Sequence, residues 1–176
     1  MFTTIFLSNF YLQAIARHQP ALRQQPLAVL DDTATKAIIL QLNDAAEVAG
    51  VRAGMAPSQA LARCLQLVIK ARSREREQQI TEILLHHAFM LSPFVEATAP
   101  GVCTVHFTST KNCRANVEAV VRQLAELQLS AQAGLAPTPD LSFLAACLAQ
   151  PVLQIDDPED FLAPLPIETL RYLPHL

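Results

Sequence analysis

The carboxylates of this 176-residue chain are the side chains that could hold a metal ion, and few of them are close to one another in the sequence. Asp31 and Asp32 directly follow an apolar run, where two carboxylates can bind a divalent cation. Adjacent acids after a strand are more often turn residues, and we expect that role for both. Glu96 stands alone in its segment, and one carboxylate supplies too few oxygens for a magnesium cage. The acidic residues therefore predict no metal site.

The thiols and imidazoles offer no better arrangement. Cys103 and His106 lie three residues apart in an expected strand, hence on opposite faces, which excludes a nucleophile and base pair. His86 and His87 are neighbours on an expected helix and point about 100° apart, so shared metal ligation is excluded too. The four cysteines lack paired C-x-x-C spacing. We expect reduced, mostly buried thiols.

Charge and hydropathy exclude two further classes. Thirteen basic against sixteen acidic residues give a net charge of −3, which argues against strong nucleic-acid binding. The basic cluster of Arg72, Arg74 and Arg76 alternates with glutamates and reads as a solvated first helical turn. No apolar run approaches the roughly 20 residues of a membrane span, and no signal peptide is evident. We expect a cytoplasmic protein with weak or no DNA binding and no membrane contact.

Alternating strands and helices must position these side chains. Period-two apolar runs predict strands, and runs with helical spacing between them predict helices. Ser8 and Asn9 are candidate caps for the first helix, and Pro100 with Gly101 suit the centre of a type II turn in a hairpin. The expected strands cover 3–8, 27–30, 37–42, 67–71, 94–98, 102–108 and 131–136. The expected helices cover 10–17, 43–49, 55–64, 73–88, 117–127 and 141–149.

Four segments in a fixed order carry a family resemblance: PALRQQPLAV (20–29), AGVRAGMAPSQALARC (49–64), SPFVEA (92–97) and AGLAPTPDLSFLA (133–145). This order resembles the palm and fingers of Y-family DNA polymerases. The segment LPIETLRYLP (165–174) resembles the non-catalytic, ImuB-like members, which belong to a bacterial mutagenesis complex.

The resemblance implies an α/β (α+β) fold. It implies a ferredoxin-like polymerase palm, with a mixed sheet and helices on one face, over residues 1–32 and 72–176. A small fingers-like insertion would cover residues 33–71, and the thumb and little finger would be absent.

The family's metal-binding positions carry no acid in this sequence. The first catalytic carboxylate of the family corresponds to the segment that ends at Asn9 and Phe10. The acidic pair of the family's hairpin corresponds to Gly101 and Val102. Phosphoryl transfer of this type uses two Mg²⁺ ions about 4 Å apart, bridged by carboxylates. We therefore expect no catalytic residue, no bound metal and no cofactor.

The family's nucleotide-binding positions are also exchanged. A Tyr and an Arg hold the triphosphate in the family, and Asp44 and Glu47 stand at those positions here. Two unit charges about 4 Å apart interact by roughly 4 kcal/mol at an effective dielectric near 20, so the exchange turns attraction into repulsion. Phe10 and Tyr11 keep the aromatic pair that excludes ribonucleotides in the family, and we expect them to serve as core.

Together these exchanges predict a catalytically inactive, ImuB-like protein that is not an enzyme. Its expected role is that of an accessory or adaptor in DNA repair, translesion synthesis and damage-induced mutagenesis. The implied partners are an error-prone polymerase, a second mutasome subunit and the sliding clamp. One alternative is a metal-dependent nucleotidyltransferase that uses Mg²⁺ with Asp31, Asp32 and Glu96 as substitute ligands. Another is a stand-alone DNA-binding module.

Overall fold

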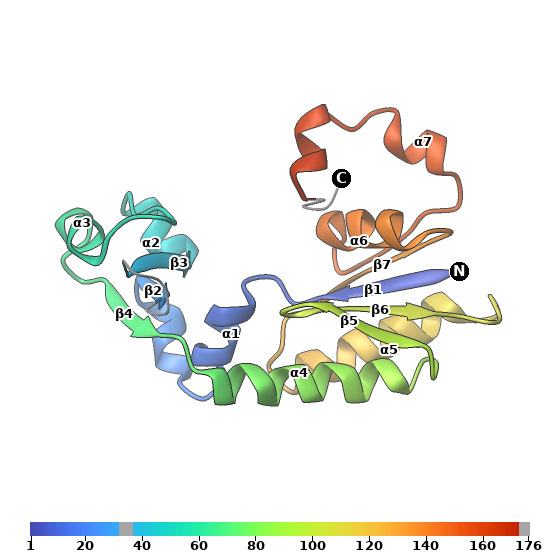
Figure 1. Ribbon diagram of the computed structural model, residues 1–176, viewed down its shortest axis with the longest axis horizontal. Coiled ribbons are helices and arrows are strands. Elements are labelled where there is room, and N and C mark those ends of the chain that lie inside the picture. The colour runs from blue at the N-terminus through green and yellow to red at the C-terminus, as the bar shows by residue number, and fades with distance from the viewer. Residues whose placement is uncertain (32–36, 173–176) are drawn as a thin grey trace. The chain divides into compact units, whose positions relative to one another are not determined.

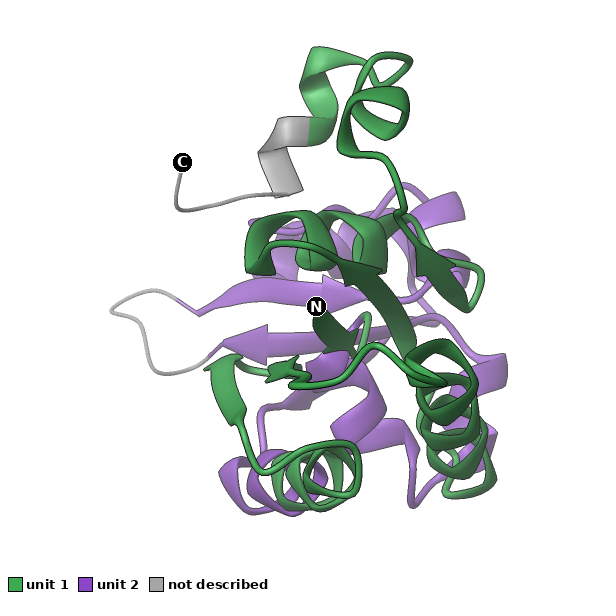
Figure 2. Cartoon of the chain, turned by 90° about the vertical axis from the view of Figure 1, so that its right-hand side faces the viewer, with its two compact units in different colours: residues 1–8, 81–176 green, residues 9–80 purple. Residues whose placement is uncertain are grey.

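The chain divides into two compact units in a computed structural model that describes residues 1–31 and 37–172, with side chains through residue 169. Unit 1 comprises residues 1–8 and 81–176, and unit 2 comprises residues 9–80 (Figure 2). Residues 9–31 and 72–80, which the resemblance assigns to the palm-like segment, belong to unit 2. Asp32, a metal ligand under the alternative of a nucleotidyltransferase, lies outside the described residues.

Five strands form one sheet in the described part of unit 1. Its order is β5–β6–β1–β7–β8, antiparallel except for the parallel pair of β7 and β8. The sheet is therefore mixed, as expected. The strands are β1 (Phe2–Phe6), β5 (Val95–Ala99), β6 (Val102–His106), β7 (Gln132–Ala136) and β8 (Val152–Gln154).

Helices cover both faces of this sheet. In Figure 1, α5 (Cys113–Glu126) lies on one face and α6 (Pro139–Leu148) on the other. Thr3, Thr4 and Ile5 are buried in succession along β1, which requires cover on both faces because alternate side chains point to opposite faces. The expectation of helices on one face missed α6. The remaining helices of this part are α4 (Arg74–Phe89), which begins in unit 2, α7 (Pro158–Leu162) and the 3₁₀ helix η2 (Ile167–Tyr172).

Gly134 permits the close approach of α6 to β7. A Cβ atom at this position would overlap the backbone oxygen of Ser142 and the backbone nitrogen of Ala146. Beneath α6, the Thr4 and Ser142 hydroxyls lie 2.7 Å apart, and on the opposite face of β1 the Thr3 hydroxyl donates to the Gly134 carbonyl at 2.9 Å. The contact is thus made by small residues with satisfied hydroxyls.

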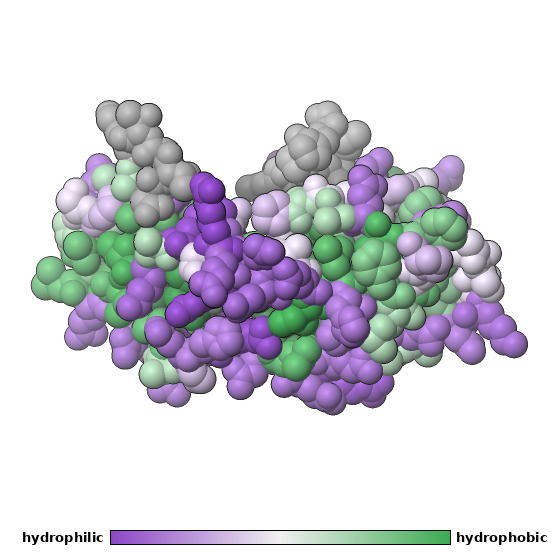
Figure 3. Space-filling view, turned by 60° about the horizontal axis from the view of Figure 1, so that its bottom comes forward, coloured by the Kyte–Doolittle hydropathy of each residue, from purple (hydrophilic) through white to green (hydrophobic). Residues whose placement is uncertain are grey.

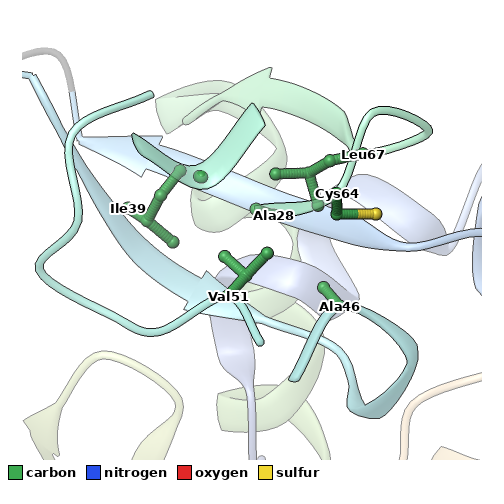
Figure 4. Close-up of a cluster of buried hydrophobic side chains, with 7 residues drawn as sticks. Ala28, Ile39, Ala46, Val51, Cys64 and Leu67 are labelled. Atoms are coloured by element: carbon green, nitrogen blue, oxygen red, sulfur yellow. The ribbon is translucent and has the colours of Figure 1, made fainter. Parts of the chain in front are cut away.

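Unit 2 is built on a smaller sheet with the order β3–β2–β4 in its described part. Ala28, Ile39, Val51 and Leu67 belong to a buried cluster on one side of β2 (Figure 4). Side chains of α1 pack with Leu27 in a second cluster, so β2 has core on both faces. The elements are α1 (Phe10–Ala16), the 3₁₀ helix η1 (Pro20–Gln24), β2 (Leu27–Asp31), β3 (Ile38–Leu42), α2 (Asp44–Val48), α3 (Pro57–Arg63) and β4 (Val68–Ala71).

The expected elements are all present and differ from the prediction at their ends, and β8 is a further strand that the sequence pattern did not predict. α6 begins at Pro139, two residues before its expected start, because Thr138 caps it and accepts a hydrogen bond from the Leu141 amide at 3.4 Å. Gly101 has φ +75, as the third residue of a type II turn requires. A search of the described helices finds none with the length and apolar character needed to cross a bilayer.

Candidate functional site

The start of the hairpin strand β6 lies beside the end of β1. Val102 is opposite Phe6 in the antiparallel ladder, and the Leu7 amide donates to the Gly101 carbonyl at 2.8 Å. The structure therefore brings Gly101 and Val102 to the end of β1. Neither residue has a carboxylate. Gly101 forms part of the hairpin turn, and the buried side chain of Val102 belongs to the core.

Asn9 opens α1 without capping it. Its backbone is left-handed, with φ 52 and ψ 43, and its side chain makes no cap hydrogen bond. The first helical amides bond instead to a distant residue: Tyr11 and Leu12 donate to the Gln41 Oε1 atom at 3.0 and 3.3 Å. The expected cap at Asn9 is wrong, because an acceptor from β3 occupies its place. Sequence offered no signal for a cap 30 residues away.

Tyr11 is held by an arginine that the sequence assigned to a solvated turn. The Arg72 guanidinium lies 4.3 Å from the centre of the Tyr11 ring, in a cation–π contact. The same group donates twice to the Glu77 carboxylate, at 3.0 and 2.7 Å. The hydrogen bond to Glu77 raises the pKa of Arg72, and the charge of Asp31 adds to it. Arg72 thus ties β4 to α1 and to the start of α4.

This arrangement removes Arg72 from the basic cluster. Glu77 is buried at 9% exposure and shields one side of the guanidinium, whereas Arg74 is exposed to solvent. Figure 3, which views the molecule from the side where α4 lies in Figure 1, shows hydrophilic side chains over that helix. Glutamates contribute to this surface, so it is not a uniformly basic patch. Phe10, at 4% exposure, is core, as expected.

Asp44 and Glu47 are exposed on α2. The helix is fixed by Asn43, whose Oδ1 atom accepts from the amides of Ala46 and Leu27 at 3.1 and 3.0 Å. Both acids lie in the first turn, where they stabilise the helix dipole. The exposed surface of α2 is therefore negatively charged at Asp44 and Glu47.

The described residues do not fit a pair of magnesium ions. In the part of the chain that the structure describes, no three His, Cys, Asp or Glu side chains are grouped so that they could hold a metal ion. Asp31 ends β2 in unit 2, and Glu96 lies on β5 in unit 1. We assign no chemical step to a metal on these residues.

Cys103 and His106 point to opposite faces of β6, as expected. Cys103 is fully buried, and burial raises the pKa of its thiol to about 12. His106 is exposed and stacks on Phe2, with 4.6 Å between ring centres. His86 is exposed and His87 half-buried. The described cysteines are free thiols, mostly buried.

Comparison with known proteins identifies the family. The family model described as "impB/mucB/samB family" matches residues 5–147. This chain belongs to that family. The family comprises Y-family polymerase domains of the UmuC and DinB type, as the resemblance implied.

Curated relatives of the impB/mucB/samB domain are named DNA polymerase IV. The protein from Photorhabdus laumondii is 28% identical over 94% of this chain and 50% of its own length. The protein from Legionella pneumophila is 24% identical over 94% of this chain and 49% of its own. The chain spans about half the length of the curated relatives it matches.

Solved structures show the same fold. DinB from Sulfolobus solfataricus superposes with a TM-score of 0.83 over 96% of this chain and 52% of that chain, at 17% identity. An insertion ternary complex of Dbh DNA polymerase gives a TM-score of 0.82 at 18% identity, over 96% of this chain and 53% of that one. The fold class expected for this impB/mucB/samB domain is therefore confirmed.

The same comparisons correct two expectations. The chain was expected not to be an enzyme, and its relatives are named as an enzyme, DNA polymerase IV. The expectation of no cofactor is also wrong, because polymerases as a class act through two metal ions. The physical error was to equate exchanged side chains at Asn9, Gly101 and Val102 with loss of activity. The residue types at three aligned positions do not by themselves determine whether a protein is an enzyme.

Proposed function

We propose that this chain acts in translesion DNA synthesis, as a Y-family polymerase domain that works within an assembly of proteins. The superposition on Dbh and DinB polymerases carries the proposal, because it covers 96% of the chain and includes both compact units. Matching relatives named DNA polymerase IV support it. In this role the chain takes part in DNA repair and in damage-induced mutagenesis, and it acts in the cytoplasm.

The two units take different parts in this proposal. Unit 1, with its mixed sheet and the hairpin of β5 and β6, corresponds to the palm. Unit 2, with α2 and α3 around the small sheet, contains the fingers. The expected fingers boundaries at residues 33 and 71 lie inside unit 2, whose additional segments include α1 and the start of α4.

The proposed partners are an error-prone polymerase, a second mutasome subunit and the sliding clamp. The closer likeness of residues 165–174 to ImuB-like members supports this set of partners. In the accessory role, the chain contributes to synthesis together with these partner proteins. The role does not require one particular component to perform each nucleotidyl transfer. DNA binding by the chain alone is proposed to be weak, because its net charge is −3.

Reconstituted synthesis past a lesion tests the proposal. A primer–template with one abasic site is extended by a candidate error-prone polymerase and its clamp, with Mg²⁺, with and without this chain. We expect the chain to raise bypass product by about tenfold, equivalent to about 1.4 kcal/mol. An undamaged template provides the control. Equal bypass with and without the chain would sink the proposal.

Nucleotidyl transfer by the chain itself is a second candidate, favoured by the name of its relatives. It predicts primer extension with Mg²⁺ or Mn²⁺ in the absence of any other protein. Primer extension that is absent with both metals would exclude this candidate.

A further inference from the structure

β5 is an edge strand with an open side. In the described part of unit 1 it pairs with β6 and with no other strand. The His106 amide donates to the Phe94 carbonyl at 2.9 Å, and Glu96 is opposite Thr104 two residues further along. Hydrogen-bonded pairs alternate in an antiparallel ladder. The backbone groups of Val95 and Ala97 therefore point away from β6.

An aromatic hollow adjoins this open edge. It has a volume of about 300 Å³, and Phe2, Phe94, Glu96 and His106 are among the residues that line it. The Phe2 ring stacks on His106 at 4.6 Å, and the Phe94 ring lies 6.1 Å from the same imidazole. Phe94 is 56% exposed. A flat apolar side chain fits such a surface, since aromatic rings pair at these separations.

The charge at the hollow indicates which residue should lie next to the apolar side chain on an incoming segment. Glu96 is exposed on β5, between two residues whose backbone groups point outward. A carboxylate beside an aromatic surface favours a lysine or arginine on the incoming chain. An incoming strand would place its apolar and basic side chains two residues apart, because alternate residues share a face.

We propose that β5 binds an extended segment of a partner protein, which adds to the sheet as a further strand. Its backbone pairs with Val95 and Ala97, its aromatic side chain enters the hollow, and its basic side chain faces Glu96. Strand addition of this kind takes affinity from the main chain and specificity from pockets for alternate side chains. The inference does not depend on the role in DNA synthesis, and its test reads binding alone.

The probe is a fluorescein-labelled peptide of sequence Thr-Lys-Val-Phe-Val-Lys-Thr, whose Phe and Lys residues share one face. Its anisotropy is followed on titration with the full chain, and saturable micromolar binding is expected. Phe94→Ala and Glu96→Lys should each weaken binding about tenfold. Phe89→Ala is the matched control, because Phe89 is also 56% exposed. Glu126→Lys, at an exposed position outside the hollow, controls for charge.

Ala97→Pro tests the backbone pairing separately. Proline removes an amide that points away from β6, so the existing ladder keeps its hydrogen bonds while the added strand loses one. Binding should fall about tenfold with an unchanged circular dichroism spectrum. Amide exchange of Val95 and Ala97 should slow when the probe binds the unaltered chain.

Three results would overturn the inference. One is no saturation below about 1 mM probe, and another is equal affinity for the Phe94→Ala and Phe89→Ala variants. The third is displacement of the probe by single-stranded oligothymidylate with Phe94-dependent affinity, which would assign the hollow to base stacking instead.

Discussion

Asp44 and Glu47 place two negative charges on the exposed side of one short helix. Residues three apart on a helix are neighbours, so the two charges act on the same ligand. Water screens exposed charges, which reduces the close-contact repulsion of about 4 kcal/mol to a fraction of that value. If the incoming nucleotide lies against α2, as the resemblance implies, these two residues weaken triphosphate binding without affecting the core.

The double variant Asp44→Tyr with Glu47→Arg should bind nucleotide more tightly. Replacing two repulsive charges by a ring and a cation should raise affinity for dATP about tenfold, or about 1.4 kcal/mol. Isothermal titration calorimetry with Mg²⁺ present measures the change. Glu126→Arg, which makes the same kind of charge change away from α2, is the control. Equal affinity in both variants would show that α2 does not face the triphosphate.

Cys103 predicts a dependence of stability on alkaline pH. Burial raises the pKa of its thiol from 9.0 to about 12, so the folded protein keeps a proton that the unfolded chain loses. The stabilisation is fully present below pH 9 and is lost as pH rises from 9 toward 12. The slope is at most about 1.4 kcal/mol per pH unit. Urea unfolding between about pH 8 and pH 10.5 measures it.

Cys103→Ala is the comparison for this slope. The variant should lose less stability over the same alkaline range, because one ionising group is removed. Parallel stability curves for the two proteins would contradict the assignment. Cys147, whose pKa burial raises to about 11, contributes to the background in both proteins.

At the scale of elements, α1 depends on β3 for its first hydrogen bonds. The Gln41 Oε1 atom accepts from Tyr11 and Leu12, in place of a cap from within the helix. The ion pair of Arg72 and Glu77 adds a second link, from β4 to the start of α4. The Gln41 acceptor and the cation–π contact of Arg72 with Tyr11 hold the segment that carries Phe10 and Tyr11.

Gln41→Leu should lower the free energy of unfolding by about 1–2 kcal/mol. Two helix-end amides lose their acceptor, which costs about as much as deleting an N-cap side chain. Gln41→Glu keeps an acceptor near the positive end of the helix and should restore most of the stability. Urea unfolding followed by circular dichroism measures both variants. Gln79→Leu, at an exposed position of α4, is the control. A Gln41→Glu variant as unstable as Gln41→Leu would exclude the capping role.

The whole molecule carries a net charge of −3, and its cluster of Arg72, Arg74 and Arg76 is interleaved with Glu75 and Glu77. Arg72 is already paired with Glu77. Non-specific binding to DNA depends on lysine and arginine contacts with phosphates, and the salt dependence reports how many are made. Under the proposed function, partner proteins therefore hold this acidic domain on DNA.

The chain alone should bind a labelled primer–template with a Kd weaker than about 1 μM at 0.15 M salt. Fluorescence anisotropy at two salt concentrations measures the affinity and its salt slope. A shallow slope is expected, since few phosphate contacts are made. Binding near about 10 nM at the same salt would instead support the stand-alone DNA-binding module.

The amino-acid sequence determined the order of strands and helices, the hairpin turn at Pro100 and Gly101, and the family. These features depend on short-range periodicity, turn chemistry and segment order, all of which are local.

Tertiary structure alone decided the contacts between distant residues. Gln41 caps α1 from 30 residues away, α6 covers the second face of the sheet through Gly134, and Phe2 meets His106 beside Phe94. Arg72 pairs with Glu77 five residues on, across a strand end and a helix start, where no helical spacing predicts contact. Such contacts depend on how elements pack, and neither periodicity nor composition of one segment encodes the partner it will meet.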